Sequence, residues 1–316
     1  MKHMKAVLPV YTVFFLLVSS CSLPEITPSG TAYIYGVTLY DGIIKDLDSP
    51  DDDARDMAAL FSAAGYTVNL RIDDGFDPDA GEASIDQLET DIDDFITGSA
   101  PGEMFIFYFA GHGGTYAQLY EALNYPEVLP LPADGTEPAY GDGQDEYLFF
   151  HGTVPDPVTG WDSFALKDDE LKTLLEKIPG HLKLVIIDAC YSGGFIGDSP
   201  FTDPVPQDYS PLDSYSSPFS GTLATYFGFS EQAAADISAG DAFVITAAGE
   251  LEVSKETLEN GVFTLAFLEA AASGDLDGNG YITLNEIYRH IDDSWSNTIF
   301  HPHIAGSAVD LVLFKL

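Results

Sequence analysis

The feature that most constrains the fold is a pair of short, continuous apolar runs in a chain that also contains amphipathic segments. MFIFYFA at 104–110 and KLVIID at 183–188 are almost entirely apolar, which is typical of parallel strands buried on both faces. The segments 51–66 and 84–96 instead place their apolar residues at helical spacing. This alternation predicts an α/β fold in which helices cover both faces of a mostly parallel sheet.

Other segments fit the same architecture. Ser84 is the expected N-cap of the helix at 84–96, and the last strand is expected within 308–316. Further strands are expected at 31–40, 67–72 and 242–248, further helices are expected at 168–178 and 262–272, and a short segment, YLFF, lies at 147–150.

The N-terminus has the pattern of an export signal. Lys2 and Lys5 precede an apolar run, 6–18, that is short for a transmembrane helix. Small residues then lead directly to Cys21, which resembles the lipobox of bacterial lipoproteins; the alternative is an ordinary secretory signal with an incidental cysteine. We expect a signal peptide at 1–20, a lipid-anchored tether at 21–30 and a folded domain at 31–316.

The resemblance to a lipobox implies an exported lipoprotein of the bacterial cell envelope. Ser22 follows the lipidated cysteine, which is similar to outer-membrane rather than inner-membrane sorting in enterobacteria. Contact with the membrane is then expected through the lipid anchor only. Cys190 is the one cysteine left in the mature chain, so no intrachain disulfide is expected.

The charge of the chain excludes a nucleic-acid partner. Twelve Lys and Arg oppose 51 Asp and Glu, for a formal net charge of −39, and such a surface repels nucleic acid and attracts cationic ligands. Adaptation to a salty habitat is an alternative cause of the acidity. Hydrophobic residues make up 46% of the chain, which argues against disorder.

Two reactive residues directly follow the buried runs. His112 lies in AGHGG after 104–110, and Cys190 lies in DACYSGG after 183–188. Because sites in α/β sheets gather at the carboxyl ends of strands, we expect the thiol and the imidazole at one sheet edge. An adjacent imidazole converts a thiol to the nucleophilic thiolate. The glycines around His112 let a backbone N–H approach a substrate carbonyl.

These motifs resemble those of caspase-like cysteine peptidases, and more closely the bacterial metacaspase-like members, sometimes called orthocaspases. The resemblance covers roughly residues 31–316 and is strongest at FYFAGHGG and VIIDACYSGG. It implies a caspase-like three-layer sandwich with Cys190 as nucleophile and His112 as general base or ion-pair partner. It also implies that Gly113 contributes the oxyanion donor.

Asp188 lies two residues before Cys190, so on a strand both side chains point the same way. A carboxylate in the S1 pocket selects a substrate with Arg or Lys at P1. The caspase signature Q-A-C-x-G has Gln at this position, and the resemblance to metacaspases implies that Asp53 is a second S1 carboxylate. The alternative for Asp53 is a plain charge at a helix N-terminus.

Residues 275–286, DLDGNGYITLNE, match a complete EF-hand loop. Gly280 occupies the sixth position, where the loop turns sharply. This pattern predicts a Ca²⁺ site, although an Asp/Asn/Gly turn that folds without metal is the alternative. The expected ligands are Asp275, Asp277, Asn279, the Tyr281 carbonyl, Thr283 and Glu286.

Taken together, the sequence predicts a monomeric, lipid-anchored cysteine endopeptidase that cleaves protein or peptide substrates after Arg or Lys. Two other functions remain open. One is a catalytically idle caspase-like module that binds cationic peptides in its acidic cleft. The other is a hydrolase that acts on a non-peptide ester or amide.

Overall fold

A computed structural model shows strands and helices alternating along the chain, as the sequence predicts. It describes residues 28–40, 46–73, 80–115, 146–152, 164–178, 180–189, 242–247, 260–295, 302–305 and 311–316. Cys21, Cys190 and the segments 1–20 and 21–27 lie outside these residues.

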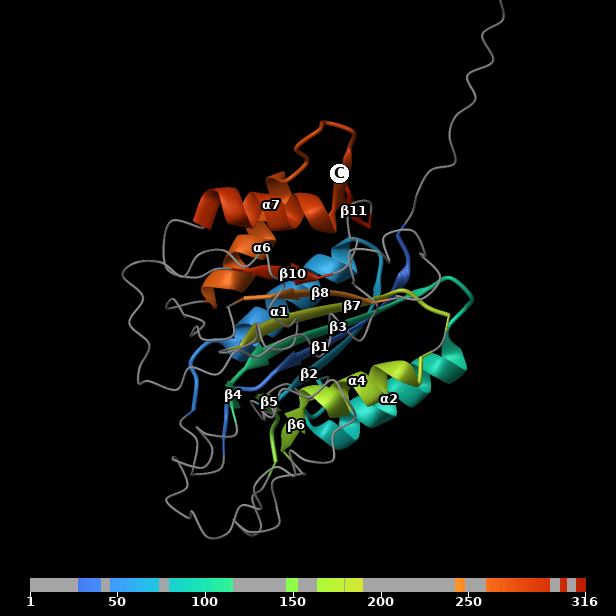
Figure 1. Cartoon of the computed structure of the whole chain (residues 1–316), viewed down its shortest axis with the longest axis vertical. Coiled ribbons are helices and arrows are strands. Elements are labelled where there is room, and N and C mark those ends of the chain that lie inside the picture. Colours follow the sequence, from blue (N-terminus) through green and yellow to red (C-terminus); the bar gives the residue numbers. More distant parts are fainter. Residues whose placement is uncertain are drawn as a thin grey trace, which may run out of the picture.

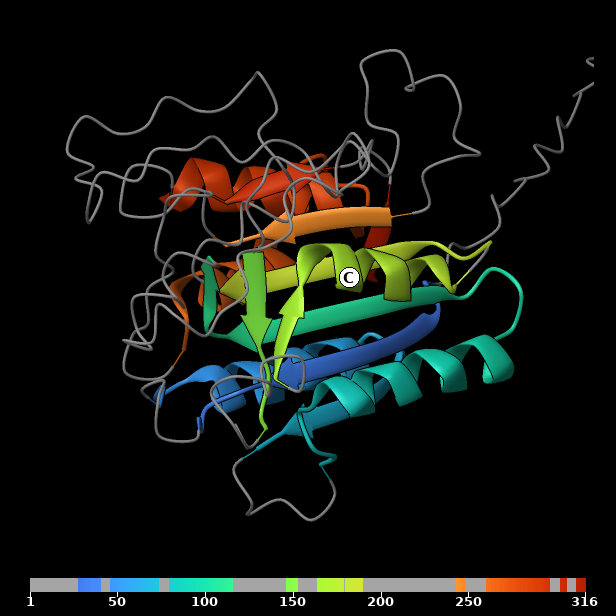
Figure 2. The same cartoon turned by 60° about the horizontal axis from the view of Figure 1, so that its bottom comes forward.

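The main sheet of the described residues contains five parallel strands and one antiparallel edge strand, in the order β10-β8-β7-β3-β1-β2. Figure 2 shows the parallel strands running in one direction, with their carboxyl ends at the same side of the sheet. The strands are β1 (Gly30–Gly36), β2 (Thr67–Ile72), β3 (Met104–Gly111), β7 (Lys183–Ala189), β8 (Ala242–Thr246) and β10 (His303–Ala305).

Helices cover both faces of this sheet, which confirms the three-layer α/β sandwich (Figure 1). One face carries α1 (Pro50–Ala63), α6 (Val262–Ser273) and α7 (Leu284–Trp295). The other carries α2 (Ile85–Gly98) and α4 (Asp168–Glu176). Within the described residues, none of the helices is both long enough and apolar enough to cross a bilayer.

The continuous apolar runs are explained by burial on both faces. Every residue of β3 and of β7 is buried, and alternate side chains enter different apolar clusters because a strand has a two-residue repeat. Phe105, Phe107 and Phe109 pack with α2 and α4. Ile106, Tyr108 and Ala110 pack with α1, α6 and α7.

Two small sheets extend the sandwich. The first contains β4 (Gly113–Thr115), β5 (Glu146–Phe149) and β6 (Ala165–Lys167), all antiparallel, and lies near the carboxyl ends of the main strands (Figure 2). The second pairs β9 (Tyr281–Thr283) with β11 (Val312–Lys315). The expected last strand therefore forms, but it leaves the main sheet, whose edge is β10 instead.

A buried ion pair fastens α2 to the first two strands. Asp91, 1% exposed, accepts hydrogen bonds from Arg71 at 2.6 and 2.9 Å and from the Tyr35 hydroxyl at 2.6 Å. The Gln87 side-chain amide donates a fourth hydrogen bond at 2.9 Å, so the carboxylate is well satisfied, as a buried charge requires. Ser84 caps the same helix by accepting a hydrogen bond from Gln87 N–H, which confirms the predicted N-cap.

Candidate active site

The register of the two central strands places the residues directly before His112 and Cys190 opposite each other. β3 pairs with β7 in parallel, with Ala110 opposite Asp188 and Gly111 opposite Ala189. His112 and Cys190 are the next residues of the two chain segments. Cys190 lies outside the described residues, so the geometry below concerns His112 and its surroundings.

Backbone hydrogen bonds hold His112 on two sides. Its carbonyl accepts a hydrogen bond from Phe149 N–H at 3.0 Å, and its own N–H donates to the Tyr40 hydroxyl at 2.8 Å. The rings of Tyr40 and His112 are in contact, with centroids 4.8 Å apart. His112 is therefore fixed at the junction between β3 and the small antiparallel sheet.

Gly113 begins β4 and pairs with Leu148 of β5. Hydrogen-bonded and non-hydrogen-bonded pairs alternate along an antiparallel ladder. Because Phe149 N–H donates to His112, the Gly113–Leu148 pair is of the non-hydrogen-bonded kind. The Gly113 N–H consequently points away from β5, as an oxyanion donor at this position requires.

Asp53 and Asp188 come together at the N-terminus of α6. They are 2% and 5% exposed and come from α1 and β7. Asp53 accepts hydrogen bonds from Gly261 N–H at 2.8 and 3.0 Å. Asp188 accepts them from Thr264 N–H at 3.2 Å and from the Thr264 hydroxyl at 2.7 Å. Asp53 is thus a buried tertiary contact rather than a plain surface charge of α1.

The physical basis of this arrangement is the unsatisfied N–H groups that begin every helix. Gly261 is the N-cap of α6 and has no side chain to cap it, so the two carboxylates from other elements do so. A Cβ at Gly261 would lie 2.5 Å from Asp188 Oδ2 and 2.9 Å from Asp53 Oδ2. Glycine is therefore needed for both carboxylates to reach the helix end.

Tyr108 continues this network into the core. Its hydroxyl lies 2.6 Å from the Thr264 hydroxyl. Burial, reinforced by the negative charges of Asp53 and Asp188, raises the pKa of Tyr108 well above its usual value. The phenol therefore keeps its proton. Since the Thr264 proton goes to Asp188, Tyr108 donates to Thr264.

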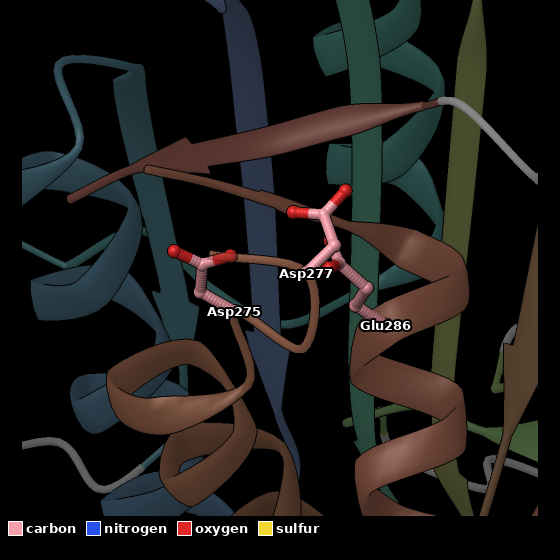
Figure 3. A group of neighbouring side chains, drawn as sticks. All are labelled: Asp275, Asp277 and Glu286. Carbon is pink, nitrogen blue, oxygen red and sulfur yellow. The ribbon is translucent and has the colours of Figure 1, made fainter. Parts of the chain in front are cut away.

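The predicted calcium loop connects α6 to α7, with Asp275 and Asp277 on the loop and Glu286 in the first turn of α7 (Figure 3). Each of these three residues offers a carboxylate oxygen, and the three oxygens lie within 4.8 Å of one another. Gly280 has a φ of +84°, which glycine adopts without strain. The loop conformation thus matches its EF-hand spacing.

Loop N–H groups orient all three acids, and Asp277 accepts its hydrogen bond from Asn279 N–H at 2.9 Å. Asp275 accepts hydrogen bonds from the backbone of residues 278–280 at 2.8–3.1 Å, and Glu286 accepts one from Leu276 N–H at 3.1 Å. The donor set consists of oxygen atoms, which suits a hard cation such as Ca²⁺. These residues therefore fit the ion.

The other predicted ligands contact the same cluster. The Asn279 amide donates to Asp277 at 2.9 Å, and the Thr283 hydroxyl donates to Glu286 at 2.9 Å. Tyr281 begins β9, which pairs with β11. The C-terminal strand thereby supports the loop, and Leu316 N–H donates to the Gly280 carbonyl at 3.0 Å.

The segment after β1 is anchored by another buried carboxylate. Asp73 accepts hydrogen bonds from Thr38 N–H at 3.0 Å and from Leu39 N–H at 2.7 Å. His151 lies 3.5 Å from Asp73 and 3.3 Å from the Leu39 carbonyl. These bonds turn the chain away from the sheet, so β1 ends at Gly36, before the expected end at residue 40.

Comparison with known proteins defines first the fold and then the family. Protein GSU0716 from Geobacter sulfurreducens has a crystal structure that aligns with a TM-score of 0.54 at 19% identity, over 89% of this chain and 94% of that chain. This likeness concerns the fold alone. The profile of the caspase domain family matches residues 29–300.

The chain belongs to the caspase domain family. Membership supports the activity of a cysteine peptidase on protein substrates. A search of proteins with curated descriptions gave no significant match.

Sequence analysis did not single out Tyr40, Tyr108, Gly261 or Thr264. Gly261 and Thr264 lie in GVFT at the start of a predicted helix, where a glycine leaves the first N–H groups without a capping side chain of its own. Tyr40 carried no comparable signal, because its contact with His112 spans 72 positions.

The Asp73–His151 contact predicts a pH dependence of stability. The hydrogen bond to Asp73 raises the pKa of His151 from 6.5 to about 9, against the opposing effect of burial, with further help from the Leu39 carbonyl and the charge of Glu82. A raised pKa means that the folded state favours the proton. The stabilisation is complete below about pH 6.5 and is lost as the pH rises through about 9.

Urea unfolding of the wild type and of His151→Gln over this pH range measures the effect. We expect the difference between their free energies of unfolding to shrink from pH 6.5 to 9 and to level off above it. A difference that stays constant across the range contradicts the prediction.

Proposed function

We propose that the protein is a cysteine endopeptidase of the metacaspase-like branch, with Cys190 as nucleophile and His112 as general base. The observation that carries this proposal is the register of β3 and β7, which pairs Gly111 with Ala189 directly before the two residues. In the reaction, Cys190 Sγ attacks the substrate carbonyl carbon while His112 holds the thiol proton. His112 then gives this proton to the leaving amine, and water hydrolyses the acyl-enzyme.

The backbone of Gly113 supports the same chemistry. Its N–H points away from β5, and a neighbouring N–H of the Cys190 segment would complete an oxyanion hole. The fixed position of the His112 backbone matters here, because Gly113 follows it directly in the chain. The proposal assigns Gly113 N–H to the stabilisation of negative charge on the carbonyl oxygen.

We further propose that Asp188 and Asp53 select Arg or Lys at P1. Both carboxylates are buried and adjacent to Gly261, and Asp188 lies two positions before the nucleophile. Two negative charges held together in a low-dielectric site are stabilised by a cationic side chain. Gly261 N–H donates to Asp53 and Thr264 N–H donates to Asp188, so the N-terminus of α6 offsets part of the repulsion between the two carboxylates.

Labelling with an arginyl peptide electrophile tests the nucleophile. We expect Cys190→Ala to remove the label and hydrolysis completely, and His112→Ala to slow both by about 10²- to 10⁴-fold, the usual contribution of a general base. Intact mass and peptide mapping locate the label. If Cys190→Ala still hydrolyses substrate, the mechanism is wrong. Peptide binding by the wild type without label or turnover would favour the idle binding module.

Substitution of the acid pair tests the specificity. Asp188→Asn and Asp53→Asn should lower kcat/KM for Arg substrates, since the loss of one partner of a buried charge pair costs roughly 2–5 kcal/mol. Asp93→Asn is the matched control, because Asp93 is an exposed acid of α2, on the opposite face of the sheet. An unchanged preference for Arg over neutral P1 residues in both variants would exclude the pair as the selector.

We also propose that the loop 275–286 binds one Ca²⁺ through Asp275, Asp277, Asn279, the Tyr281 carbonyl, Thr283 and Glu286. The convergence of three carboxylates at EF-hand positions 1, 3 and 12 supports this. When bound, the ion would supply a positive charge that ties α6 to α7 across the loop. No step of the peptidase reaction passes through it.

Thermal unfolding in calcium and in chelator tests the metal site. At a calcium concentration about 100-fold above the Kd, binding adds about 2.7 kcal/mol to the free energy of unfolding, so Tm should rise by several degrees. Glu286→Gln should abolish most of the rise, whereas Glu269→Gln, an exposed acid of α6, should keep it. Identical curves in calcium and in chelator exclude the site.

We propose in addition that residues 1–20 are a signal peptide and that lipid on Cys21 anchors a monomeric domain, 31–316, to the outer membrane. The pattern of small residues before Cys21 supports this. Expression in a bacterial host with labelled palmitate should give a labelled wild type and an unlabelled Cys21→Ser variant. A wild type cleaved and released without label would instead indicate an ordinary secretory signal.

A further inference from the structure

One side chain outside the proposed dyad contacts both the backbone and the ring of His112. Tyr40, 9% exposed, lies at the end of the segment that follows β1. Its hydroxyl accepts the His112 N–H at 2.8 Å and shares its single proton between the carbonyls of Val37 and Phe149, at 3.1 and 3.3 Å. Its ring contacts the imidazole at a centroid distance of 4.8 Å.

The Tyr40 hydroxyl takes the place of a ladder hydrogen bond. Phe149 N–H donates to the His112 carbonyl, and in a hydrogen-bonded antiparallel pair the return bond would run from His112 N–H to the Phe149 carbonyl. Here the hydroxyl lies between these two groups and bonds to both. Tyr40 therefore links His112 to β5 and to the end of β1 at once.

The adjacent residue of β3 is adapted to this hydroxyl. A Cβ at Gly111 would lie 2.8 Å from Tyr40 Oη and 2.9 Å from Phe109 Cζ. Such distances leave no room for a larger residue unless Tyr40 moves. The glycine before His112 thus allows Tyr40 to approach the backbone of the proposed base.

Tyr40 is itself held firmly. Its N–H donates to Asp46 at 2.8 Å, and Val37 N–H donates to the Ala110 carbonyl at 2.9 Å. Asp73 accepts the two intervening N–H groups, those of residues 38 and 39. The backbone of this segment cannot rotate without breaking these hydrogen bonds. Tyr40 is therefore held in place and can in turn hold His112 in place.

We infer that Tyr40 is the positioning residue of His112, fixing the backbone of the base with its hydroxyl and the imidazole with its ring. Tyr40 acts through His112 and performs no proton transfer of its own. The inference rests on the proposed function, in which His112 activates Cys190. Misplacement of a catalytic group by about 1 Å can cost about 10²-fold in rate, so the effect of Tyr40 is measurable.

The pH dependence of Cys190 alkylation by iodoacetamide provides the test, because it reports the thiolate and requires no substrate. The purified full chain is alkylated over a pH series, and the peptide that contains Cys190 is quantified by mass spectrometry. Tyr40→Phe keeps the ring and removes the hydroxyl. We expect its alkylation midpoint to move upward by about one pH unit, toward that of His112→Ala, as the thiolate loses roughly tenfold stabilisation.

Tyr66→Phe is the matched control, because it also removes a buried hydroxyl, which donates to the Leu313 carbonyl at 2.9 Å. Its alkylation midpoint should equal that of the wild type. Gly111→Ala is a second test that leaves Tyr40 in place but displaces its hydroxyl, and it should shift the midpoint as Tyr40→Phe does. Melting curves establish that each variant is folded.

Peptidase assays add a second readout. Tyr40→Phe should lower kcat by about 10- to 100-fold with KM nearly unchanged, since Tyr40 contacts the base and not the S1 carboxylates. A folded Tyr40→Phe or Gly111→Ala whose alkylation profile coincides with the wild type overturns the inference. If His112→Ala also leaves the profile unchanged, the proposed dyad fails, and the role of Tyr40 fails with it.

Discussion

The parallel pairing of β3 with β7 is the interaction on which the rest of the structure depends. Both strands are buried along their whole length, so their apolar residues stabilise the two layers of helices simultaneously. Their register also determines where each segment leaves the sheet: one continues to His112 and the other to Cys190. A shift by one residue would reverse the faces of all side chains and separate the two positions. The packing of the hydrophobic core and the placement of the candidate catalytic residues therefore both depend on the register of β3 and β7.

At three places in the structure, buried carboxylates are stabilised by hydrogen bonds. Asp53 and Asp188 cap α6 from outside it, Asp73 accepts the backbone after β1, and Asp91 binds Arg71. In each case a carboxylate satisfies donors that would otherwise be buried without acceptors. The two carboxylates at α6 differ from the others because one of them, Asp188, lies two positions before the proposed nucleophile in the sequence. The cap of a helix and the proposed selection of cationic substrates thus depend on the same atoms.

The parts of the fold that the sequence predicted are those with local signals. Continuous apolar runs marked β3 and β7, helical spacing marked α1 and α2, and Ser84 marked a cap, because each pattern reflects burial of the element itself. The prediction was poorer where the position of an element depends on the strand with which it pairs. The C-terminal run was recognised as a strand, yet it pairs with β9 beside the loop 275–286 rather than with the main sheet. The hydrophobic pattern of a strand indicates that the strand is buried, but it does not indicate which other strand it pairs with.

The candidate site likewise contains features that local sequence patterns predict and features that depend on tertiary contacts. The sequence by itself determined the α/β alternation, the placement of His112 after a buried strand and the EF-hand spacing of the acids, since these follow from residue type and short-range spacing. Only the tertiary structure decided that Asp53 is a buried partner of Gly261, that Thr264 holds Asp188, and that Tyr40 clamps His112. These contacts join residues 72 to 208 positions apart. Their formation depends on how the packed layers bring distant segments together, which no local pattern encodes.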